Sequence, residues 1–251
     1  MTDSAAEPAS LGMVTRGVAV AGVKGGVGTT VVTLLSAFAL ETHRSDDQVT
    51  VLVDVGGDIA VALGIEQGAG ICEVAAGVPI EEVLMELVEN PHDDPEPTWE
   101  LPVLLRQGER RPSLGEVDDA VSQIRSLGWL PVVDCGSREK GALMLADLSE
   151  RWLLSRLMCL VPTVAAAEAR WAFSESDMAV LVPVNEGILD VEDFAADAEV
   201  DAVLPFMEHL DSWQHDRRTH LEFAAARVGQ GDAQAAAAVS AVAALLEIPH
   251  S

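Results

Sequence analysis

The sequence has no tyrosine, only two lysines (Lys24 and Lys140) and three cysteines in 251 residues. The cysteines, Cys72, Cys135 and Cys159, are odd in number and form no C-x-x-C pair, which argues against a cysteine-bound iron–sulfur cluster. Each cysteine stands in or beside an apolar run. We therefore expect reduced thiols that fill core space in a cytoplasmic protein.

Basic side chains are scarce. The chain has 15 lysines and arginines but 41 aspartates and glutamates, and its formal net charge is −26. Such a charge repels nucleic-acid phosphates and anionic lipid headgroups, so nonspecific DNA binding is not expected. Two interpretations of the charge stay open. It keeps the protein soluble, or suits it to a salty cytoplasm; alternatively, it fits a basic protein partner.

Long hydrophobic runs are also missing. Charges interrupt every apolar stretch before the roughly 18–20 residues of a membrane span, and residues 1–13 do not resemble a targeting signal. We expect a flexible tail at 1–14 and one α/β domain at 15–251. The Ala-rich run at 232–248 predicts a packed helix, and no Lys or Arg follows it, so a direct membrane anchor is not expected.

A glycine-rich loop joins a predicted strand at 17–22 to a predicted helix at 31–40. Glycines let backbone N–H groups turn inward, and the helix N-terminus adds partial positive charge, which together suit a phosphate. The hydroxyl of Thr30 would then reach Mg²⁺. The stretch departs twice from G-x-x-x-x-G-K-[ST], at Val23 and at Thr29. A glycine-rich turn without a ligand is the alternative.

Two further predicted strands end in an acid. The run at 49–54 ends in Asp54, and an apolar run that starts at 129 ends in Asp134. Alternating strands and helices predict a three-layer α/β sandwich around a mostly parallel sheet, whose ligands bind where the strands end. Lys24, Asp54 and Asp134 all fall there. For Asp134, capping of a strand-end turn is the alternative to a metal role.

The glycine loop resembles the deviant Walker A motif, K-G-G-x-G-[KST]-[TS], of the ParA/MinD ATPases, which have a SIMIBI-type P-loop NTPase fold. Thr in place of the second lysine is similar to the CpaE/TadZ-like branch. The resemblance implies ATP and Mg²⁺ as cofactors of one P-loop domain, an ATP-dependent homodimer, and a signature lysine that reaches the partner's nucleotide. The matching residues are Lys24, Gly25, Gly26, Val27, Gly28, Thr29 and Thr30.

The resemblance also assigns roles to the acids. Asp54 matches the first acid of the family's A′ motif, near Mg²⁺, and Asp134 matches the Walker B acid, so Thr30, Asp54 and Asp134 form the expected metal set. Gly56 stands where relatives carry a second acid that orients the attacking water. Asp58 either replaces it, which gives Lys24, Asp54 and Asp58 as catalytic residues, or caps the helix predicted at 59–63. Hydrolysis should be slow.

These residues predict a nucleotide-dependent dimerising switch that positions a cellular structure such as a septum or a pilus or secretion machinery. A tyrosine-kinase relative would need the tyrosines that the chain lacks. A chromosome- or plasmid-partitioning ATPase would need a basic face, and a non-hydrolysing scaffold of the same fold is the other alternative. We also expect a strand at 101–108, an exposed loop at 90–97, and a base-contacting element near 202–206.

Overall fold

The computed structural model describes residues 16–43, 48–62, 70–83, 101–106, 110–163, 166, 173–174, 177–183, 190–205 and 233–246. One parallel sheet of seven strands organises this part of the chain, in the order β3-β2-β4-β1-β5-β6-β7. The strands are β1 (Val18–Gly22), β2 (Thr50–Asp54), β3 (Val103–Leu104), β4 (Leu130–Ser137), β5 (Ser155–Leu160), β6 (Met178–Leu181) and β7 (Ala202–Val203).

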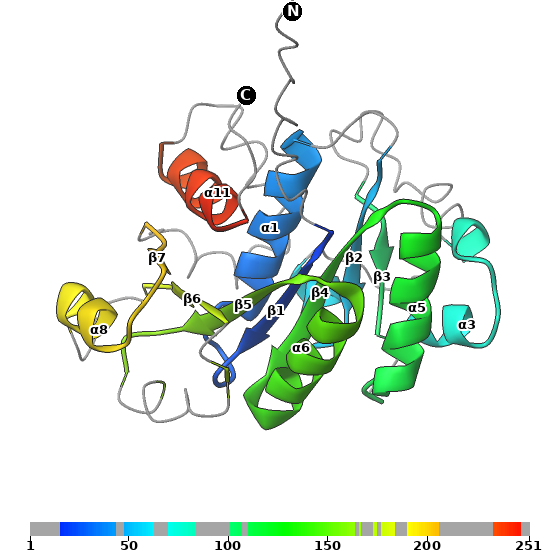
Figure 1. The fold of residues 1–251 in the computed structure, drawn as a ribbon, viewed down its shortest axis with the longest axis horizontal. Coiled ribbons are helices and arrows are strands. Elements are labelled where there is room, and N and C mark those ends of the chain that lie inside the picture. Colours follow the sequence, from blue (N-terminus) through cyan, green and yellow to red (C-terminus); the bar gives the residue numbers. More distant parts are fainter. Residues whose placement is uncertain are drawn as a thin grey trace, which may run out of the picture.

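Helices cover both faces of the sheet, so the predicted three-layer α/β fold is confirmed (Figure 1). α1 and α11 pack together on one face, while α3, α5 and α6 lie on the other. The helices with described bounds are α1 (Thr29–His43), α2 (Ile59–Ala62), α3 (Ile71–Ala75), α5 (Leu114–Ser126), α6 (Arg138–Trp152), α8 (Val191–Asp197) and α11 (Ala233–Leu245).

Strand β1 shows how the sequence makes these layers. Its side chains alternate between faces, as the period of two in a strand requires. Val18 and Val20 join the core under α1 and α11, and Ala19 and Ala21 join the core under α5 and α6. Because both faces are covered, the strand is apolar throughout, which is typical of a parallel sheet.

The predicted core elements are confirmed with shifted ends. The helix expected at 31–40 is the longer α1, and the one expected at 232–248 is α11. β3 occupies only two residues of the strand expected at 101–108, of which 107–108 lie outside the described residues. The loop expected at 90–97 and the tail at 1–14 lie outside them entirely. In the part of the chain that the structure describes, no helix is long and apolar enough to cross a membrane.

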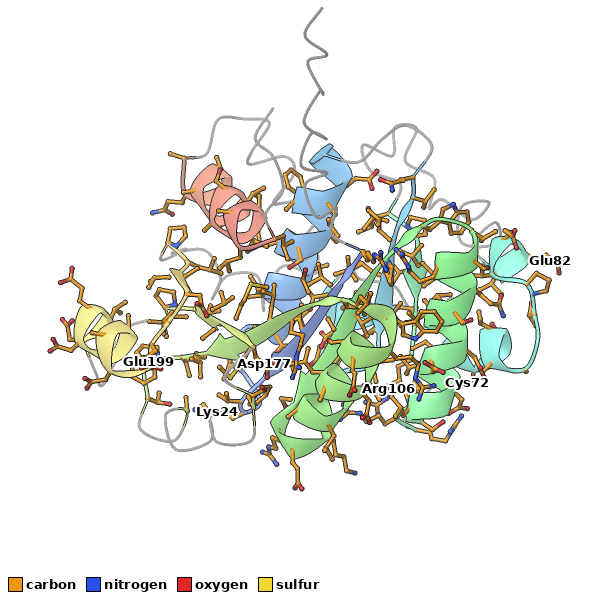
Figure 2. The ribbon with its side chains drawn as sticks, viewed as in Figure 1. Lys24, Cys72, Glu82, Arg106, Asp177 and Glu199 are labelled. Carbon is orange, nitrogen blue, oxygen red and sulfur yellow. The ribbon has the colours of Figure 1, made fainter. Side chains whose placement is uncertain are left out.

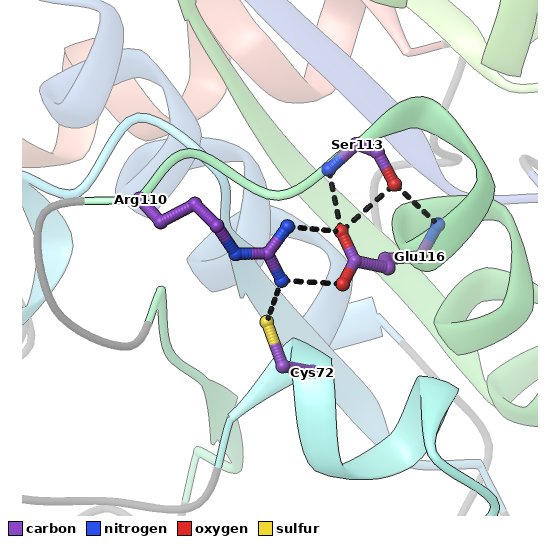
Figure 3. A network of polar contacts seen from close by, with 4 residues as sticks. All are labelled: Cys72, Arg110, Ser113 and Glu116. Carbon is purple, nitrogen blue, oxygen red and sulfur yellow. Dashed lines mark hydrogen bonds and ion pairs between the residues drawn. The ribbon is translucent and has the colours of Figure 1, made fainter.

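Helix α5 was not among the predicted elements, and a capping box begins it. Ser113 Oγ accepts from the backbone N–H of Glu116, whose carboxylate accepts from the N–H of Ser113. The same carboxylate binds Arg110, and Arg110 also donates to Cys72 Sγ on α3 at 3.0 Å (Figure 3). This network joins the starts of α3 and α5 on one face of the sheet.

Candidate functional site

The glycine loop follows β1 and turns into α1. Gly26 and Gly28 have positive φ angles of 74° and 83°, which side chains other than glycine rarely adopt. A Cβ on Gly22 would stand 2.3 Å from Thr29 Oγ1, and one on Gly28 would stand 3.0 Å from Val182 on the segment after β6. Glycine is therefore required both for the turn and for close packing against the start of α1 and the segment after β6.

Three side chains of this loop have different surroundings. Lys24 is half-buried and makes no hydrogen bond or ion pair with the residues that the structure describes. Figure 2 labels it at the edge of the sheet where β1 ends. Val27 is fully buried, and Thr29 is only 8% exposed. The position where many ParA/MinD sequences place a second lysine therefore holds a short, buried hydroxyl.

Thr30 and Asp134 meet across the site. Thr30 lies in the first turn of α1, and its Oγ1 donates to Asp134 Oδ2 at 3.0 Å. Asp134 is 1% exposed, and its Oδ1 accepts from the backbone N–H of Gly136 at 2.8 Å. The structure thus brings together two predicted metal ligands that stand 104 positions apart in the sequence.

Asp54 lies beside Asp134, because the two residues are register partners in the neighbouring strands β2 and β4. Asp54 is fully buried, and its oxygens accept from the backbone N–H groups of Gly57 at 2.7 Å and Ala60 at 3.2 Å. Ala60 lies in the first turn of α2. The carboxylate that caps this helix is therefore Asp54, whereas the sequence left that role open for Asp58.

Burial beside a second carboxylate raises the pKa of both acids. Desolvation raises the pKa of Asp134 to about 7, and the neighbouring Asp54 carboxylate adds to the shift. Desolvation also raises the pKa of Asp54, against backbone hydrogen bonds that lower it. Two buried carboxylates side by side are costly unless a cation or a proton joins them. The pair therefore favours binding of a positive ion.

The loop after β2 contains the two positions discussed for the attacking water. A Cβ on Gly56 would stand 3.0 Å from Asp134 Oδ1 and 3.4 Å from its Oδ2, so any side chain there would press on that carboxylate. Asp58 is exposed and makes no hydrogen bond or ion pair within the described ranges. Its charge contributes to the raised pKa of Asp54 and of Asp134, so it lies within electrostatic range of both.

Two arginines that the sequence analysis did not single out, one after β3 and one before α5, contact the loop after β2 and the end of β4. Arg106 donates from Nη1 to the carbonyl of Gly56 at 3.0 Å, and Arg111 donates from Nη2 to the carbonyl of Cys135. Figure 2 labels Arg106 on the same edge of the sheet as Lys24. One indication of a role for Arg106 was present in the sequence, since this residue stands near the carboxyl end of the strand expected at 101–108, where ligands of a parallel sheet bind.

The oxygen donors suit a hard cation. A threonine hydroxyl and two carboxylates are the ligands that Mg²⁺ prefers, and this ion usually completes its shell with water and phosphate oxygens. Within the described ranges, no group of three or more His, Cys, Asp or Glu side chains forms a metal cluster. Thr30, Asp54 and Asp134 would supply three oxygens and leave the rest of the Mg²⁺ shell to water and ligand oxygens.

Comparison with known proteins identifies the fold. A ParA family ATPase from Chlorobium tepidum TLS is similar with a TM-score of 0.61 and 12% sequence identity, over 93% of this chain and 98% of that chain. The MinC:MinD cell division protein complex of Aquifex aeolicus gives 0.63 and 18%, over 93% and 98%. The MinD cell division protein of Aquifex aeolicus gives 0.60 and 17%, over 92% and 95%.

These identities are low, so the likeness establishes the fold alone. The chain has the α/β fold of the ParA/MinD-type P-loop ATPases. A scan against family models found no match, and a search of curated proteins found none.

Proposed function

We propose that residues 15–251 form one P-loop domain that binds ATP with Mg²⁺ and acts as a nucleotide-dependent dimerising switch. The hydrogen bond between Thr30 Oγ1 and Asp134 Oδ2 carries this proposal. It joins the start of the helix after the glycine loop to the acid of a neighbouring strand, with Asp54 alongside. A plain glycine turn would not require that a hydroxyl and two buried carboxylates converge beside it.

The proposed roles follow from position. Backbone N–H groups of residues 24–30 would hold phosphates at the start of α1, where the helix dipole favours negative charge. Thr30, Asp54 and Asp134 would hold Mg²⁺, which neutralises phosphate charge when bound. Lys24 would pair with a phosphate. Its side chain has no partner among the described residues, which leaves it available to a nucleotide on its own or a second chain.

We propose slow hydrolysis. A water-orienting acid accelerates phosphoryl transfer by positioning the nucleophile, and Gly56 provides none. Asp58 is the remaining candidate, since it is exposed on the same loop and within electrostatic range of both buried acids. Turnover should then fall below about 1 s⁻¹, the lower end of typical enzymes.

The cellular role that we propose is positioning of a structure such as a septum or a pilus or secretion machinery. The similar MinC:MinD cell division complex supports a switch that works through a protein partner. The net charge of −26 favours a partner with a basic surface over nonspecific DNA, and so argues against chromosome or plasmid partitioning. The unpaired cysteines support a cytoplasmic protein, and the absence of Lys and Arg from residues 232–251 supports one without a direct membrane anchor.

Calorimetry tests the binding site. Wild-type protein should bind ATP in an Mg²⁺-dependent manner, and Thr30→Ala should weaken that binding. Thr33→Ala is the matched control, because Thr33 lies one turn further along α1 and donates to the carbonyl of Thr29 at 2.9 Å, inside the helix. Absence of nucleotide binding by the wild type, or equal weakening in both variants, would contradict the proposed site.

Light scattering tests the switch. ATP should promote a symmetric dimer more strongly than ADP, because the γ-phosphate supplies the differential contact. Lys24→Ala should retain some ATP binding but lose the ATP-dependent mass increase, since a charged hydrogen bond of about 1.5–3 kcal/mol is lost at each of two sites. Lys140→Ala, at an exposed position of α6, is the control. Equal masses in all samples would reject the switch.

A non-catalytic scaffold is the second candidate. It is favoured by Gly56, which lacks the acid, and by Thr29, which is buried where a lysine is common. In that case nucleotide stabilises the dimer without turnover. Steady-state ATPase assays with and without candidate partners separate the two, because a scaffold stays inactive when ATP-bound dimers are present.

A further inference from the structure

The peptide group between Gly56 and Gly57 lies between a carboxylate and a guanidinium. Its N–H, on Gly57, donates to Asp54 Oδ1 at 2.7 Å. Its carbonyl, on Gly56, accepts from Arg106 Nη1 at 3.0 Å. Arg106 is therefore connected to Asp54 through a single peptide plane.

The peptide group between Cys135 and Gly136 has the same arrangement. Its N–H, on Gly136, donates to Asp134 Oδ1 at 2.8 Å, and its carbonyl, on Cys135, accepts from Arg111 Nη2. Both buried acids thus receive a hydrogen bond from a glycine peptide that an arginine holds from the other side. The two arrangements involve different strands and different arginines.

Close packing accompanies these bonds. A Cβ on Gly57 would stand 3.0 Å from Arg106 Nη1, and one on Gly136 would stand 3.3 Å from Arg111 Nη2. Both glycines have positive φ angles, 93° and 71° respectively. Glycine accepts either sign of φ at little cost, so its own conformation does not hold the peptide in one orientation. The arginine bond to the carbonyl supplies that restraint.

A donor on the carbonyl side also polarises the peptide and strengthens its N–H as a donor, and a charged donor does so most. The remaining oxygens of the two acids accept from Ala60 of α2 and from Thr30 of α1. One oxygen of each carboxylate therefore accepts from a helix residue. The other accepts from a glycine N–H whose peptide carbonyl is bound by an arginine.

We propose that Arg106 and Arg111 are positioning residues that hold these peptides so that Asp54 and Asp134 stay oriented for a bound cation. The identity of that cation as Mg²⁺ rests on the proposed function, which this inference extends to residues outside the glycine loop. Neither arginine needs to touch the ion or a phosphate for this role.

Glycine amides report the proposed arrangement directly in protein labelled with ¹⁵N-glycine. Gly136 is the only glycine that follows a cysteine and Gly57 one of two that follow a glycine, so carbonyl labelling of the preceding residue identifies them. Arg106→Ala should move the Gly57 amide upfield and speed its solvent exchange without affecting Gly136. Arg111→Ala should do the reverse.

Lysine variants and a control arginine separate positioning from a general loss of structure. Arg106→Lys and Arg111→Lys keep a cationic donor, so each should return the amide shift and exchange rate of its glycine most of the way to the wild-type values. If an alanine variant fails to fold, the lysine variant at the same position still tests the proposal. Arg110→Ala, whose exposed side chain binds Glu116 and Cys72, should move neither amide. Unmoved glycine amides in both alanine variants would overturn the proposal.

Titration with Mg²⁺ alone, followed at the same amides, tests the consequence for the site. Loss of a residue that orients a ligand should weaken Mg²⁺ affinity about tenfold or more, with recovery in the lysine variants. Unchanged Mg²⁺ affinity, or no Mg²⁺ binding by the wild type, would overturn the positioning role. Wild-type protein that binds Mg²⁺ but no ATP would instead reject the proposed function and leave the arginine roles standing.

Discussion

Two carboxylates are buried at opposite ends of the parallel strands, and burial of a charge costs free energy at both positions. Their surroundings differ. Asp177 precedes β6, its side chain is 1% exposed, and it forms an ion pair with Arg156 near the start of β5. Its Oδ2 also accepts from the backbone N–H of Ser174 at 2.9 Å. Asp134, 1% exposed near the carboxyl end of β4, has another carboxylate, Asp54, as its register partner on β2.

We interpret Asp177 as a structural residue and Asp134 as a candidate functional residue, because only Asp177 has a cationic partner in the described part of the chain. An ion pair such as that of Asp177 satisfies a buried charge inside the folded protein. At Asp134 the protein places a second carboxylate beside the first, and the pKa of Asp134 rises to about 7 because desolvation and Asp54 both disfavour ionisation. A bound cation, as in the proposed function, would stabilise such a site. We therefore expect substitutions at the two ends of the strands to change stability in opposite directions.

Removal of Arg156 should have the largest destabilising effect. Arg156→Met would leave Asp177 buried without its cation, which should reduce the free energy of unfolding by about 3–5 kcal/mol. Urea unfolding measures the change. Arg151→Met is the matched control, because Arg151 pairs with Asp118 while its side chain is 58% exposed. A loss from Arg156→Met no larger than that of the control would show that the two buried acids do not differ in this way.

Substitution of Asp134 should stabilise the protein instead, and only at higher pH. Its pKa is raised to about 7 in the folded state from 3.8, so the folded protein holds a proton that the unfolded chain loses. Stability therefore falls as the pH rises between these values. Asp134→Asn should remove that decline and gain on the order of 4 kcal/mol at pH 8 without Mg²⁺, since one pKa unit corresponds to about 1.4 kcal/mol.

Thermal unfolding from pH 4 to pH 8 measures this decline in the wild type and in Asp134→Asn. Asp119→Asn, an exposed position on α5, should keep the wild-type profile. A wild-type stability that is flat over this range would mean that Asp134 carries no unfavourable charge, and the contrast with Asp177 would disappear.

Added Mg²⁺ should increase the free energy of unfolding of the wild type, by less than the Asp134→Asn substitution does. At about ten times its dissociation constant, an ion that binds only the folded state adds about 1.4 kcal/mol. The gain should appear at pH 8 and disappear at pH 5, where Asp134 holds a proton, and it should be absent in Asp134→Asn. Melting curves in MgCl₂ and in NaCl of equal ionic strength make the comparison. An equal shift in NaCl would indicate screening of the surface charge.

The convergence of Thr30, Asp54 and Asp134 was predictable from the sequence. Each of the two acids ends an apolar run with many β-branched residues, and the threonine follows a glycine loop, so the parallel-sheet rule brings all three to one edge. The order of strands was not predictable in the same way. Pairing depends on long-range packing, and the sequence pattern did not specify that β4 lies between β1 and β2.

The missed features were missed for different reasons. The sequence of α5 does carry a helical signal, since the capping box of Ser113 and Glu116 precedes apolar residues at i, i+3, i+4 and i+7, namely Val117, Ala120, Val121 and Ile124, and the prediction overlooked it. Arg106 and Arg111 act on backbone carbonyls, which every residue carries, so no pattern of side chains marks their partners. The expected roles of Lys24 and Asp58 involve a nucleotide, a water molecule or a second chain, and they remain predictions.

The smallest effect should come from a third carboxylate, Glu116, which tests whether burial or pairing sets the size of these changes. Glu116 is paired as Asp177 is, since it binds Arg110 and accepts from Ser113 (Figure 3), but its side chain is 23% exposed and that of Arg110 is 62% exposed. These bonds lower the pKa of Glu116 to about 2, with Arg110 as the main cause. Any stability that they add is therefore present above about pH 4.5 and is lost as the pH falls toward 2.

Solvent and salt screen such a pair, so Arg110→Ala should leave the urea midpoint at pH 7 unchanged within the error of measurement. Repetition at pH 2, where Glu116 is half protonated, should show no difference from the wild type either. A loss at pH 7 comparable with that of Arg156→Met would mean that a guanidinium–carboxylate contact stabilises this protein regardless of exposure. The different stability effects expected at Asp177 and Asp134 would then depend on whether the acid has a cationic partner. Burial of the acid would not be needed to explain them.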